Sequence, residues 1–301
     1  MSGELTGVFV ALITPFTDDG KAIDENRFKI HIDEQIEAGV HGLVPGGSTG
    51  EFVALSLQER KQLLELTIKF ADGRVPVVAG IGALTTLESL DLARHAAQIG
   101  AAATMVVPPF YDPVNLTQLR ELLSEIHDAS ELPIVYYNIP AASGLTLSPQ
   151  EIADLSQVGV KYLKDTSGNA PALTELLFGL DDQITAFNGW DTLTFYGLVA
   201  GARGTVWGAT NVIPDLSVQL WNAIAVEKDL DKGRALWRKI YPICKFLESH
   251  NYSSAVKTGL ELQGKATGGT RKPFALLQGD AVEELAGLLT NAGIQVVKAT
   301  V

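Results

Sequence analysis

Cysteine and long apolar segments are nearly absent from this sequence. The single cysteine, Cys244, excludes an intrachain disulfide framework and fits a reducing compartment, and its helical surroundings favour a buried structural thiol. The longest apolar stretches, residues 100–110 and 132–137, are far shorter than the ~20 residues that span a bilayer. The N-terminal residues have neither a basic region nor a long apolar region, so we expect no secretory signal, no membrane association and a cytoplasmic location.

Positive charge and histidine are also scarce. The chain has 23 lysines and arginines against 35 aspartates and glutamates, which gives a formal net charge of −12 and a pI near 4.9 without a basic patch. Such a chain repels nucleic acid and anionic membranes. Its five histidines show no metal-ligand spacing, which argues against metal catalysis, and no Walker-type phosphate loop is present. An anionic substrate must therefore be held by local backbone amides and a lysine.

The sequence does contain an alternation of short apolar runs and longer amphipathic segments over its first two-thirds. This rhythm is typical of repeated βα units around a parallel sheet. Eight such units favour a closed (β/α)8 TIM barrel over an open sheet. No G-x-G-x-x-G follows the first apolar run, which weakens the dinucleotide-binding alternative. The expected strands are residues 8–13, 42–44, 75–79, 104–107, 134–137, 160–164, 184–187 and 204–206.

Helices are expected between these strands and at the C-terminal end of the chain. Several begin with a good N-cap, as at Ser56 and Glu59, whose spacing matches a capping box. We interpret residues 1–225 as a catalytic barrel and residues 226–301 as a C-terminal helical extension packed on it. The expected helices are residues 24–38, 56–70, 86–99, 116–129, 148–156, 172–177 and 191–200, followed by 215–226, 231–249, 254–263 and 279–291.

Reactive side chains are expected at the carboxyl ends of the strands, because these ends face the active-site mouth of an α/β barrel. After the second strand, paired glycines permit a tight turn, and Ser48 and Thr49 offer hydroxyls and free amides to a carboxylate or phosphate. An ordinary turn with capping hydroxyls is an equal alternative for this segment alone. The fifth strand ends at Tyr136 and Tyr137, which alternate in direction, so Tyr137 can relay protons in the mouth or simply pack.

The sixth strand carries two lysines on opposite faces, Lys161 and Lys164, so at most one of them points inward. Lys164 ends the strand and is the better candidate. A poorly hydrated barrel interior disfavours its ammonium form, which leaves a neutral amine able to attack a ketone. At the seventh exit, Gly189 and Asp191 can bind substrate hydroxyls, although capping of the following helix is the more common role for an aspartate such as Asp191.

Four motifs together resemble, in the same order and at matching strand ends, those of the pyruvate-dependent class I aldolase family. That family includes dihydrodipicolinate synthase and N-acetylneuraminate lyase. Each motif alone is weak, but the resemblance runs from about residue 7 to about residue 292. The motifs are Gly47-Ser48-Thr49-Gly50-Glu51, Tyr137-Asn138-Ile139-Pro140, Lys164-Asp165-Thr166-Ser167-Gly168 and Asn188-Gly189.

The resemblance implies a role for each matching residue. Lys164 forms the Schiff base with a 2-oxo acid such as pyruvate, and Tyr137 moves protons to and from the substrate. Ser48 and Thr49 bind the carboxylate, and Thr49 also relays protons to Tyr137. Tyr111 is inserted by a neighbouring subunit, which implies a homotetramer built from tight dimers. No metal and no cofactor besides the lysine imine is implied, and the remaining substrate-binding residues are Thr166, Gly189, Asp191 and Val206.

Departures from the family pattern bear on the substrate. Dihydrodipicolinate synthases carry an arginine after the Y-N-x-P turn, where this chain has Ala142, so the turn is more similar to that of N-acetylneuraminate lyase. That lyase has an acid and a serine where this chain has Thr192 and Gly208. Trp190 and Trp207 are expected to make the far pocket more apolar. We therefore expect a lyase that releases pyruvate and a different aldehyde, for example from a 2-keto-3-deoxy sugar acid such as 2-keto-3-deoxygluconate.

Three alternatives stay open. The first is the biosynthetic 4-hydroxy-tetrahydrodipicolinate synthase reaction, and the second is dehydration or hydration of a 2-keto-3-deoxy acid through the same imine. The third is a non-catalytic ligand-binding barrel, against which the intact Lys164, Tyr137 and Thr49 argue. Product analysis separates cleavage from dehydration, because cleavage gives pyruvate and an aldehyde whereas dehydration gives a new 2-oxo acid.

Overall fold

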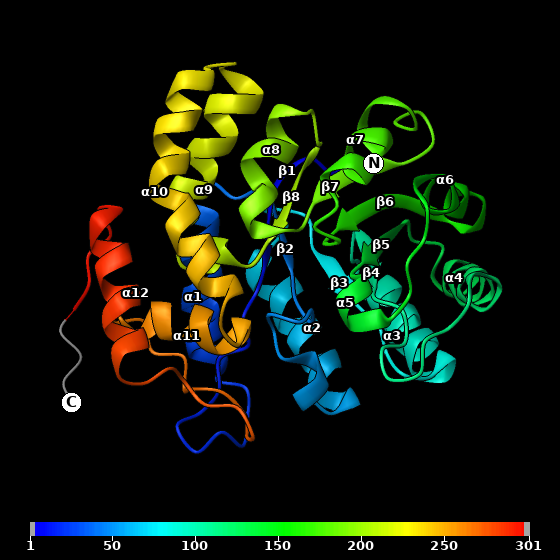
Figure 1. Ribbon diagram of the computed structural model, residues 1–301. Coiled ribbons are helices and arrows are strands. Elements are labelled where there is room, and N and C mark those ends of the chain that lie inside the picture. Colours follow the sequence, from blue (N-terminus) through cyan, green and yellow to red (C-terminus); the bar gives the residue numbers. More distant parts are fainter. Residues whose placement is uncertain (1–3, 298–301) are drawn as a thin grey trace.

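Eight parallel strands form the centre of the molecule in a computed structural model that describes residues 4–297. They pair in the order β2-β1-β8-β7-β6-β5-β4-β3. A parallel bridge between Leu43 and Val77 joins the two ends of this sheet, and the Leu43 amide donates to the Pro76 carbonyl at 3.0 Å. The sheet therefore closes into a (β/α)8 TIM barrel, as expected (Figure 1). Its strands are β1 (Gly7–Ala11), β2 (Gly42–Val44), β3 (Val78–Gly80), β4 (Ala103–Val106), β5 (Ile134–Asn138), β6 (Val160–Asp165), β7 (Thr185–Asn188) and β8 (Gly204–Trp207).

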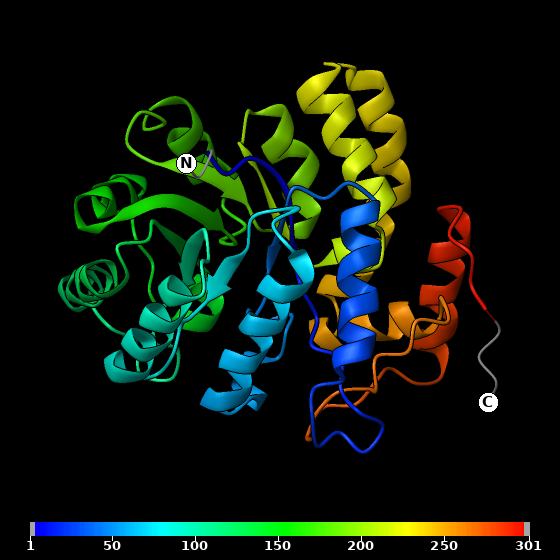
Figure 2. The ribbon, with the colours of Figure 1, turned by 180° about the vertical axis from the view of Figure 1, so that it is seen from behind.

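Helices surround the barrel in all views (Figures 1 and 2). Within residues 4–297, none of them has the length and apolar content needed to cross a membrane. The α-helices are α1 (Glu25–Glu37), α2 (Leu57–Ala71), α3 (Thr86–Gln98), α4 (Leu116–Ser130), α5 (Pro140–Ser143), α6 (Pro149–Ala153), α7 (Ala170–Phe178), α8 (Thr194–Val199), α9 (Pro214–Trp221), α10 (Leu230–Glu248), α11 (Tyr252–Glu261) and α12 (Asp280–Asn291). Shorter helical turns are η1 (Phe52–Ala54), η2 (Asp154–Val158), η3 (Asp191–Leu193), η4 (Ala209–Asn211) and the π-helical η5 (Asn222–Val226).

The predicted elements are all present, with shifts at their ends. Strand β3 begins three residues later than expected because Pro76 has no amide hydrogen to donate to a neighbouring strand. The expected helix at residues 148–156 is α6 followed by η2, and that at residues 191–200 is η3 followed by α8. The short helix α5 was not expected, since Pro140 at its first position is its main local signal. The predicted capping box is confirmed, because Ser56 and Glu59 bond reciprocally at the start of α2.

Side-chain alternation along the strands divides the core into two apolar layers. Residues such as Tyr162 and Phe187 fill the barrel interior, whereas Leu163 packs outward beneath the helices. Strands of a parallel sheet are buried on both faces, which explains why the apolar runs are nearly continuous. On β6 the same alternation directs Lys164 inward and leaves Lys161 exposed. The predicted opposition of the two lysines is therefore confirmed.

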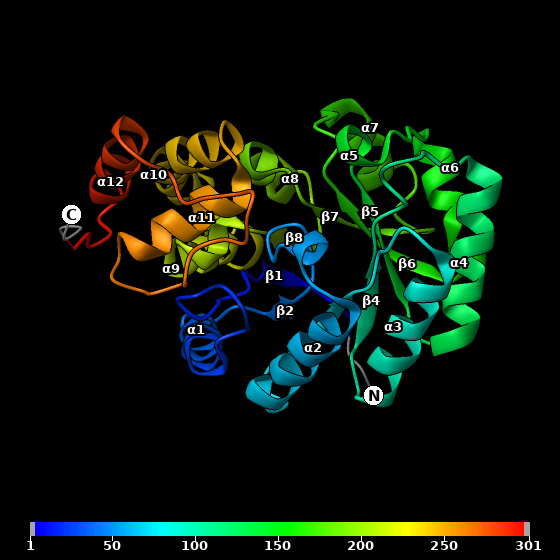
Figure 3. The same ribbon diagram turned by 90° about the horizontal axis from the view of Figure 1, so that it is seen from below.

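The C-terminal helices α10, α11 and α12 lie together on one side of the barrel (Figures 1 and 3). Their apolar faces pack with residues of β8 and α9 into a cluster that includes Trp207, Leu220 and Cys244. The thiol of Cys244 is fully buried there. We keep residues 1–225 and 226–301 as a proposed division into barrel and extension, and its boundary falls at the end of η5.

Candidate active site

A cavity of about 260 Å³ opens at the carboxyl ends of the strands. The residues that the sequence placed in the site line it, with the exceptions of Tyr111 and Trp207. The C-terminal helices also contribute to its wall. The lining residues are Ser48, Thr49, Tyr137, Ile139, Lys164, Thr166, Gly189, Trp190, Asp191, Val206, Gly208, Glu248, Tyr252 and Ser253.

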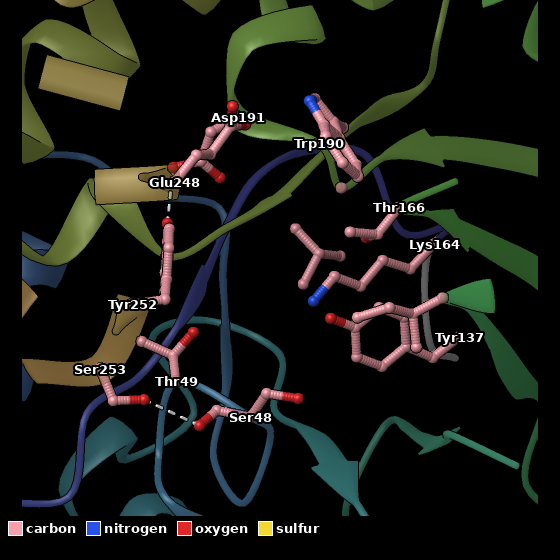
Figure 4. A pocket seen from close by; sticks show the side chains of 14 residues that line it. Ser48, Thr49, Tyr137, Lys164, Thr166, Trp190, Asp191, Glu248, Tyr252 and Ser253 are labelled. Atoms are coloured by element: carbon pink, nitrogen blue, oxygen red, sulfur yellow. Dashed lines mark hydrogen bonds between the residues drawn. The ribbon is translucent and has the colours of Figure 1, made fainter. Parts of the chain in front are cut away.

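Lys164 extends from the end of β6 into this cavity, as Figure 4 shows. Its side chain is 6% exposed, and its Nζ lies 3.8 Å from the centre of the Tyr137 ring. Gly189 makes room for it, because a Cβ there would lie 2.7 Å from Lys164 Cγ and 2.4 Å from Thr166 Oγ1. Within residues 4–297, no carboxylate forms an ion pair with Lys164 and Thr166 Oγ1 has no hydrogen-bond partner. The amine is therefore available to a bound molecule, and the buried Thr166 hydroxyl lies beside it without a partner in the described residues.

The two tyrosines of β5 lie in opposite environments. Tyr137 lines the cavity, whereas Tyr136 is fully buried on the outer face of the strand. Burial raises the pKa of the Tyr136 phenol, and the nearby Asp165 raises it further. Asp165 accepts a hydrogen bond from Asn138 Nδ2 at 2.8 Å, which ties the end of β5 to the end of β6. Asp165 and Asn138 therefore hold the two strand ends in register, with Tyr137 and Lys164 facing the cavity.

The turn after β2 presents free backbone amides. The Gly50 amide donates to the Gly47 carbonyl at 3.0 Å, and a Cβ at Gly50 would lie 2.9 Å from the Leu12 carbonyl oxygen. The amides of Ser48 and Thr49 have no acceptor within the described chain. Such amides suit a carboxylate, as the sequence predicted. No hydrogen bond joins the Thr49 and Tyr137 hydroxyls in the described residues, so a relay between them stays a prediction.

A buried ion pair holds this turn from the C-terminal side. Lys257 Nζ lies 2.5 Å from Glu51 Oε1, and both side chains are almost fully buried. Lys257 also donates to the Gly269 carbonyl at 2.6 Å and lies 4.2 Å from the centre of the Phe16 ring. Burial lowers the pKa of Lys257 to about 8, although Glu51 acts in the opposite direction. This pair was not expected from the sequence, in which its only local signal is a lysine inside an apolar helical stretch.

The end of the cavity away from Tyr137 is acidic. Tyr252 from α11 donates to Asp191 Oδ2 at 2.5 Å, and Glu248 from α10 accepts hydrogen bonds from the amide and hydroxyl of Thr192, both at 2.9 Å. Burial raises the pKa of Asp191 to about 7, and the hydrogen bond from Tyr252 partly opposes that shift. Burial also raises the pKa of Glu248. Because Asp191 lies inside η3 and makes no capping hydrogen bond, the capping alternative is wrong.

Two expectations about the far pocket need correction. Trp190 lines the cavity, but Trp207 is 1% exposed and packs among the C-terminal helices. The cause is alternation along β8, which turns Val206 inward and Trp207 outward. The pocket is also more polar than expected, because Glu248 and Tyr252 enter it from helices that the sequence analysis did not connect with the site. Ala142 is exposed on α5 and lies outside the lining.

Tyr111 lies outside the cavity and is 84% exposed. It follows β4 at the same end of the barrel as the cavity. In the described chain it therefore completes no part of the site within its own subunit. Its predicted insertion into a neighbouring subunit stays a prediction.

Comparisons with known proteins agree with this arrangement. A model of the dihydrodipicolinate synthetase family matches residues 4–292. A 4-hydroxy-tetrahydrodipicolinate synthase from Methanopyrus kandleri is 34% identical over 299 residues, which cover 98% of each chain. Among solved structures, a putative dihydrodipicolinate synthetase from Pseudomonas aeruginosa superposes with a TM-score of 0.92 at 31% identity, over 96% of this chain and 100% of its own.

A second solved structure bears on the ligand. A prophage protein of E. coli K12 that belongs to the dihydrodipicolinic acid synthase family, solved in complex with pyruvate, has a TM-score of 0.92 and 28% identity. The superposition covers 97% of this chain and 100% of the prophage protein. The name of the Methanopyrus relative supports the biosynthetic alternative better than the lyase that we expected from the sequence.

Proposed function

Because the chain belongs to the dihydrodipicolinate synthetase family, we propose that it is a class I aldolase that forms an imine between Lys164 and pyruvate. One observation carries this proposal: an inward-facing amine, which forms no ion pair within residues 4–297, lies in a cavity at the mouth of the barrel. The free amides of Ser48 and Thr49 support it, since they suit the carboxylate of a 2-oxo acid.

The proposed reaction begins when Lys164 Nζ attacks the ketone carbon of pyruvate. Loss of water gives a protonated imine, which withdraws electrons and makes the adjacent methyl group acidic. Tyr137, beside the amine, is the proton carrier that converts the imine to an enamine and back. The enamine carbon adds to an aldehyde in condensation, and the reverse sequence cleaves the same bond. The lysine imine serves as electron sink, so the reaction requires no cofactor.

Two reactions are candidates for the step in which the bond to the aldehyde forms or breaks. Synthesis of 4-hydroxy-tetrahydrodipicolinate is the first, because the Methanopyrus relative carries that name over nearly the whole length of both chains. Cleavage of a 2-keto-3-deoxy acid is the second, and a specific observation favours it. Lys164 is the only lysine or arginine among the lining residues that the structure describes, so no further cation is placed to bind a carboxylate on the aldehyde. Dehydration through the same imine differs from cleavage, because its product is a single new 2-oxo acid and not pyruvate with an aldehyde.

Borohydride reduction in the presence of pyruvate tests the proposed imine. We expect mass spectrometry to find the reduced adduct on the peptide that contains Lys164, and no adduct in Lys164→Met. Lys161→Met is the matched control, because Lys161 belongs to the same strand but is exposed. An unmodified Lys164 peptide at saturating pyruvate, in folded protein, contradicts the proposal.

We also propose a homotetramer made of two tight dimers, in which Tyr111 of one subunit reaches the site of its neighbour. The exposure of Tyr111 supports this arrangement, together with that of Leu84 and Leu87 after the neighbouring strand β3. Large apolar side chains exposed close together are typical of protein interfaces.

A further inference from the structure

A second cavity, of about 280 Å³, lies between helix α1 and the segment that follows α11, on the side of the barrel where the C-terminal helices pack (Figure 3). None of the described residues lines both this cavity and the catalytic one. Its volume is close to the lower end of the range that is typical of small-molecule sites. No residue that lines it takes part in the proposed reaction, so its chemistry has to be explained separately.

The wall formed by residues 264–267 is held in place by hydrogen bonds. The Phe16 amide donates to the Thr267 carbonyl at 2.8 Å, and the Thr267 amide and hydroxyl donate to Glu261 Oε1 at 2.6 and 2.7 Å. Gly268 has a left-handed φ of 72°, and a Cβ there would lie 1.9 Å from the Phe16 carbonyl oxygen, so only glycine fits. The cavity is therefore preformed, and a ligand loses little free energy in ordering its wall.

Two cations and one carboxylate line the cavity, on Arg27, Lys265 and Glu34. Lys265 Nζ lies 2.9 Å from Glu34 Oε2, and both side chains are partly exposed. Arg27 donates through Nη1 to the Phe16 carbonyl at 2.7 Å and through Nη2 to Asp18 Oδ1 at 2.6 Å. One hydrogen on each terminal nitrogen is left without an acceptor within residues 4–297. Because the carboxylates that hold the guanidinium lie outside the lining, the cavity itself favours an anion.

His31 of α1 adds a hydrogen-bond acceptor to the lining. Asn211 Nδ2 donates to the carbonyl oxygens of Ala11 and Gly208, at 2.8 and 2.7 Å. Asn211 Oδ1 therefore faces His31 Nε2, at 2.8 Å, and Nε2 carries the hydrogen. Burial lowers the pKa of His31 to about 4, and the nearby Lys265 acts in the same direction, so the ring is neutral at neutral pH and its Nδ1 is an acceptor. No donor in residues 4–297 bonds to Nδ1, so a ligand can supply one.

The remaining lining is largely apolar and includes Ile13, Leu260 and Ala266. A ligand that suits all of these groups has a carboxylate for the two cations, a hydroxyl that donates to His31 Nδ1, and a short aliphatic chain. Because Lys265 lies near His31, the hydroxyl and the carboxylate belong on neighbouring carbons. A 2-hydroxy acid with an aliphatic tail meets these conditions.

His31 and Asn211 connect the two cavities. Asn211 bonds to His31 on one side and donates to the carbonyl of Gly208, which lines the catalytic cavity, on the other. The Ile13 amide also donates to Asn211 Oδ1, at 3.1 Å. A hydroxyl that donates to His31 Nδ1 strengthens the bond from Nε2 to Asn211, because hydrogen bonds in a chain polarise one another. A ligand in the second cavity therefore holds the end of β8 more firmly at Gly208.

We propose that the second cavity binds a small 2-hydroxy acid and that this ligand raises the affinity of the catalytic cavity for pyruvate through His31 and Asn211. A catalytic cavity whose wall is already ordered loses less free energy when pyruvate binds. The site itself does not depend on the proposed reaction, whereas its effect on pyruvate rests on the proposed imine at Lys164.

Isothermal titration calorimetry of the full chain with 2-hydroxy-4-methylpentanoate tests the site. Saturating pyruvate is present, so that the catalytic cavity is occupied. We expect saturable binding with a Kd of about 1 mM or below. Removal of the hydroxyl, in 4-methylpentanoate, or of the carboxylate, in 4-methylpentane-1,2-diol, should weaken binding by about 10-fold or more. The absence of saturable binding, or equal binding of the acid without the hydroxyl, overturns the proposal.

Lys265→Met tests the location of the site, because it removes one of the two cations that line the cavity. We expect the Kd for 2-hydroxy-4-methylpentanoate to rise by about 10-fold. Lys232→Met is the matched control, because Lys232 forms a partly exposed ion pair with Glu227 outside the cavity, and we expect it to leave the Kd unchanged. Thermal unfolding shows that both variants are folded. An unchanged Kd in Lys265→Met overturns the assignment of the ligand to this cavity.

The effect on pyruvate is measured as the pyruvate concentration that gives half-maximal borohydride trapping on Lys164. We expect this concentration to fall by about 5-fold as the hydroxy acid is added and to level off once the second site is filled. A rise in proportion to the acid shows competition for the catalytic cavity and overturns the proposal, and a constant value overturns the effect on pyruvate. Failure of trapping without the acid contradicts the proposed imine, whereas the calorimetric result for the second cavity stands.

Discussion

Tyr136 and Tyr137 are chemically identical neighbours whose surroundings give them different roles. Tyr137 lies in the cavity with the amine of Lys164 over its ring, so its hydroxyl can meet a substrate. Tyr136 is fully buried, and its hydroxyl has no hydrogen-bond partner within residues 4–297. A buried hydroxyl without a partner lowers stability. Successive side chains of a strand point to opposite faces, so Tyr137 reaches the cavity whereas Tyr136 packs in the core.

Replacement of each tyrosine by phenylalanine separates these roles. We expect Tyr137→Phe to slow turnover by about 10²-fold or more while imine trapping with pyruvate stays largely intact, because proton transfer and not amine attack loses its catalyst. Tyr136→Phe is the matched control, and we expect full activity and a free energy of unfolding in urea that is higher by about 1 kcal/mol. Full turnover by Tyr137→Phe would remove this residue from the proton path.

At the scale of elements, the sequence predicted those parts of the site that come from strand ends. The alternation of side-chain direction and the position at a strand end were enough to place Lys164 and Tyr137. The direction of each of these side chains depends only on the strand to which the residue belongs. Glu248 and Tyr252 could not be found in this way, since they lie on helices whose packing against the barrel mouth is decided by distant apolar contacts. Trp207 was misplaced for a local reason: its strand ends one residue later than expected, and the extra residue faces outward.

The Glu51–Lys257 pair connects two elements that are far apart in the chain. Glu51 ends the turn that carries Ser48 and Thr49 and has a left-handed φ of 57°, a conformation that costs energy for a residue other than glycine. Lys257 on α11 compensates its buried charge, and the Arg271 amide donates to Glu51 Oε2 at 3.1 Å. Helix α11 therefore helps to hold the turn in the geometry that presents its free amides.

We expect Lys257→Met to lower the free energy of unfolding by about 3–5 kcal/mol, because it leaves the Glu51 carboxylate buried without a cation. In the folded fraction, we expect the KM for pyruvate to rise more than kcat falls, since the change displaces the carboxylate-binding turn and not Lys164. Urea unfolding and steady-state kinetics measure the two effects. Lys257→Met combined with Glu51→Gln should recover part of the lost stability. Additive losses in the double variant would show that the two residues are not coupled.

At the scale of the whole molecule, large apolar side chains are exposed in the segments that follow two adjacent strands, β3 and β4. Tyr111, 84% exposed, follows β4, and Leu84 and Leu87 follow the adjacent β3 with 52% and 75% of their surface exposed. Burial of such side chains against a second copy would stabilise a dimer by about 25 cal/mol per Å² of apolar surface. The same contact would carry Tyr111 from one subunit toward the cavity of the other. Assembly and catalysis are therefore coupled in the tetramer that we propose.

Leu87→Asp tests this coupling, because it places a charge in the proposed interface without altering a residue that lines the cavity. We expect sedimentation velocity to show a tetramer for the unaltered protein and smaller species for the variant. Turnover should fall by about 10-fold or more, since Tyr111 no longer reaches its neighbour, whereas the pyruvate imine still forms. Ile30→Asp, an equivalent change at an exposed apolar residue of α1, should leave assembly and turnover intact. A variant that sediments as a monomer and keeps full turnover would contradict the role of Tyr111, because each site would then be complete within one subunit. An unaltered protein that sediments as a monomer would contradict the tetramer.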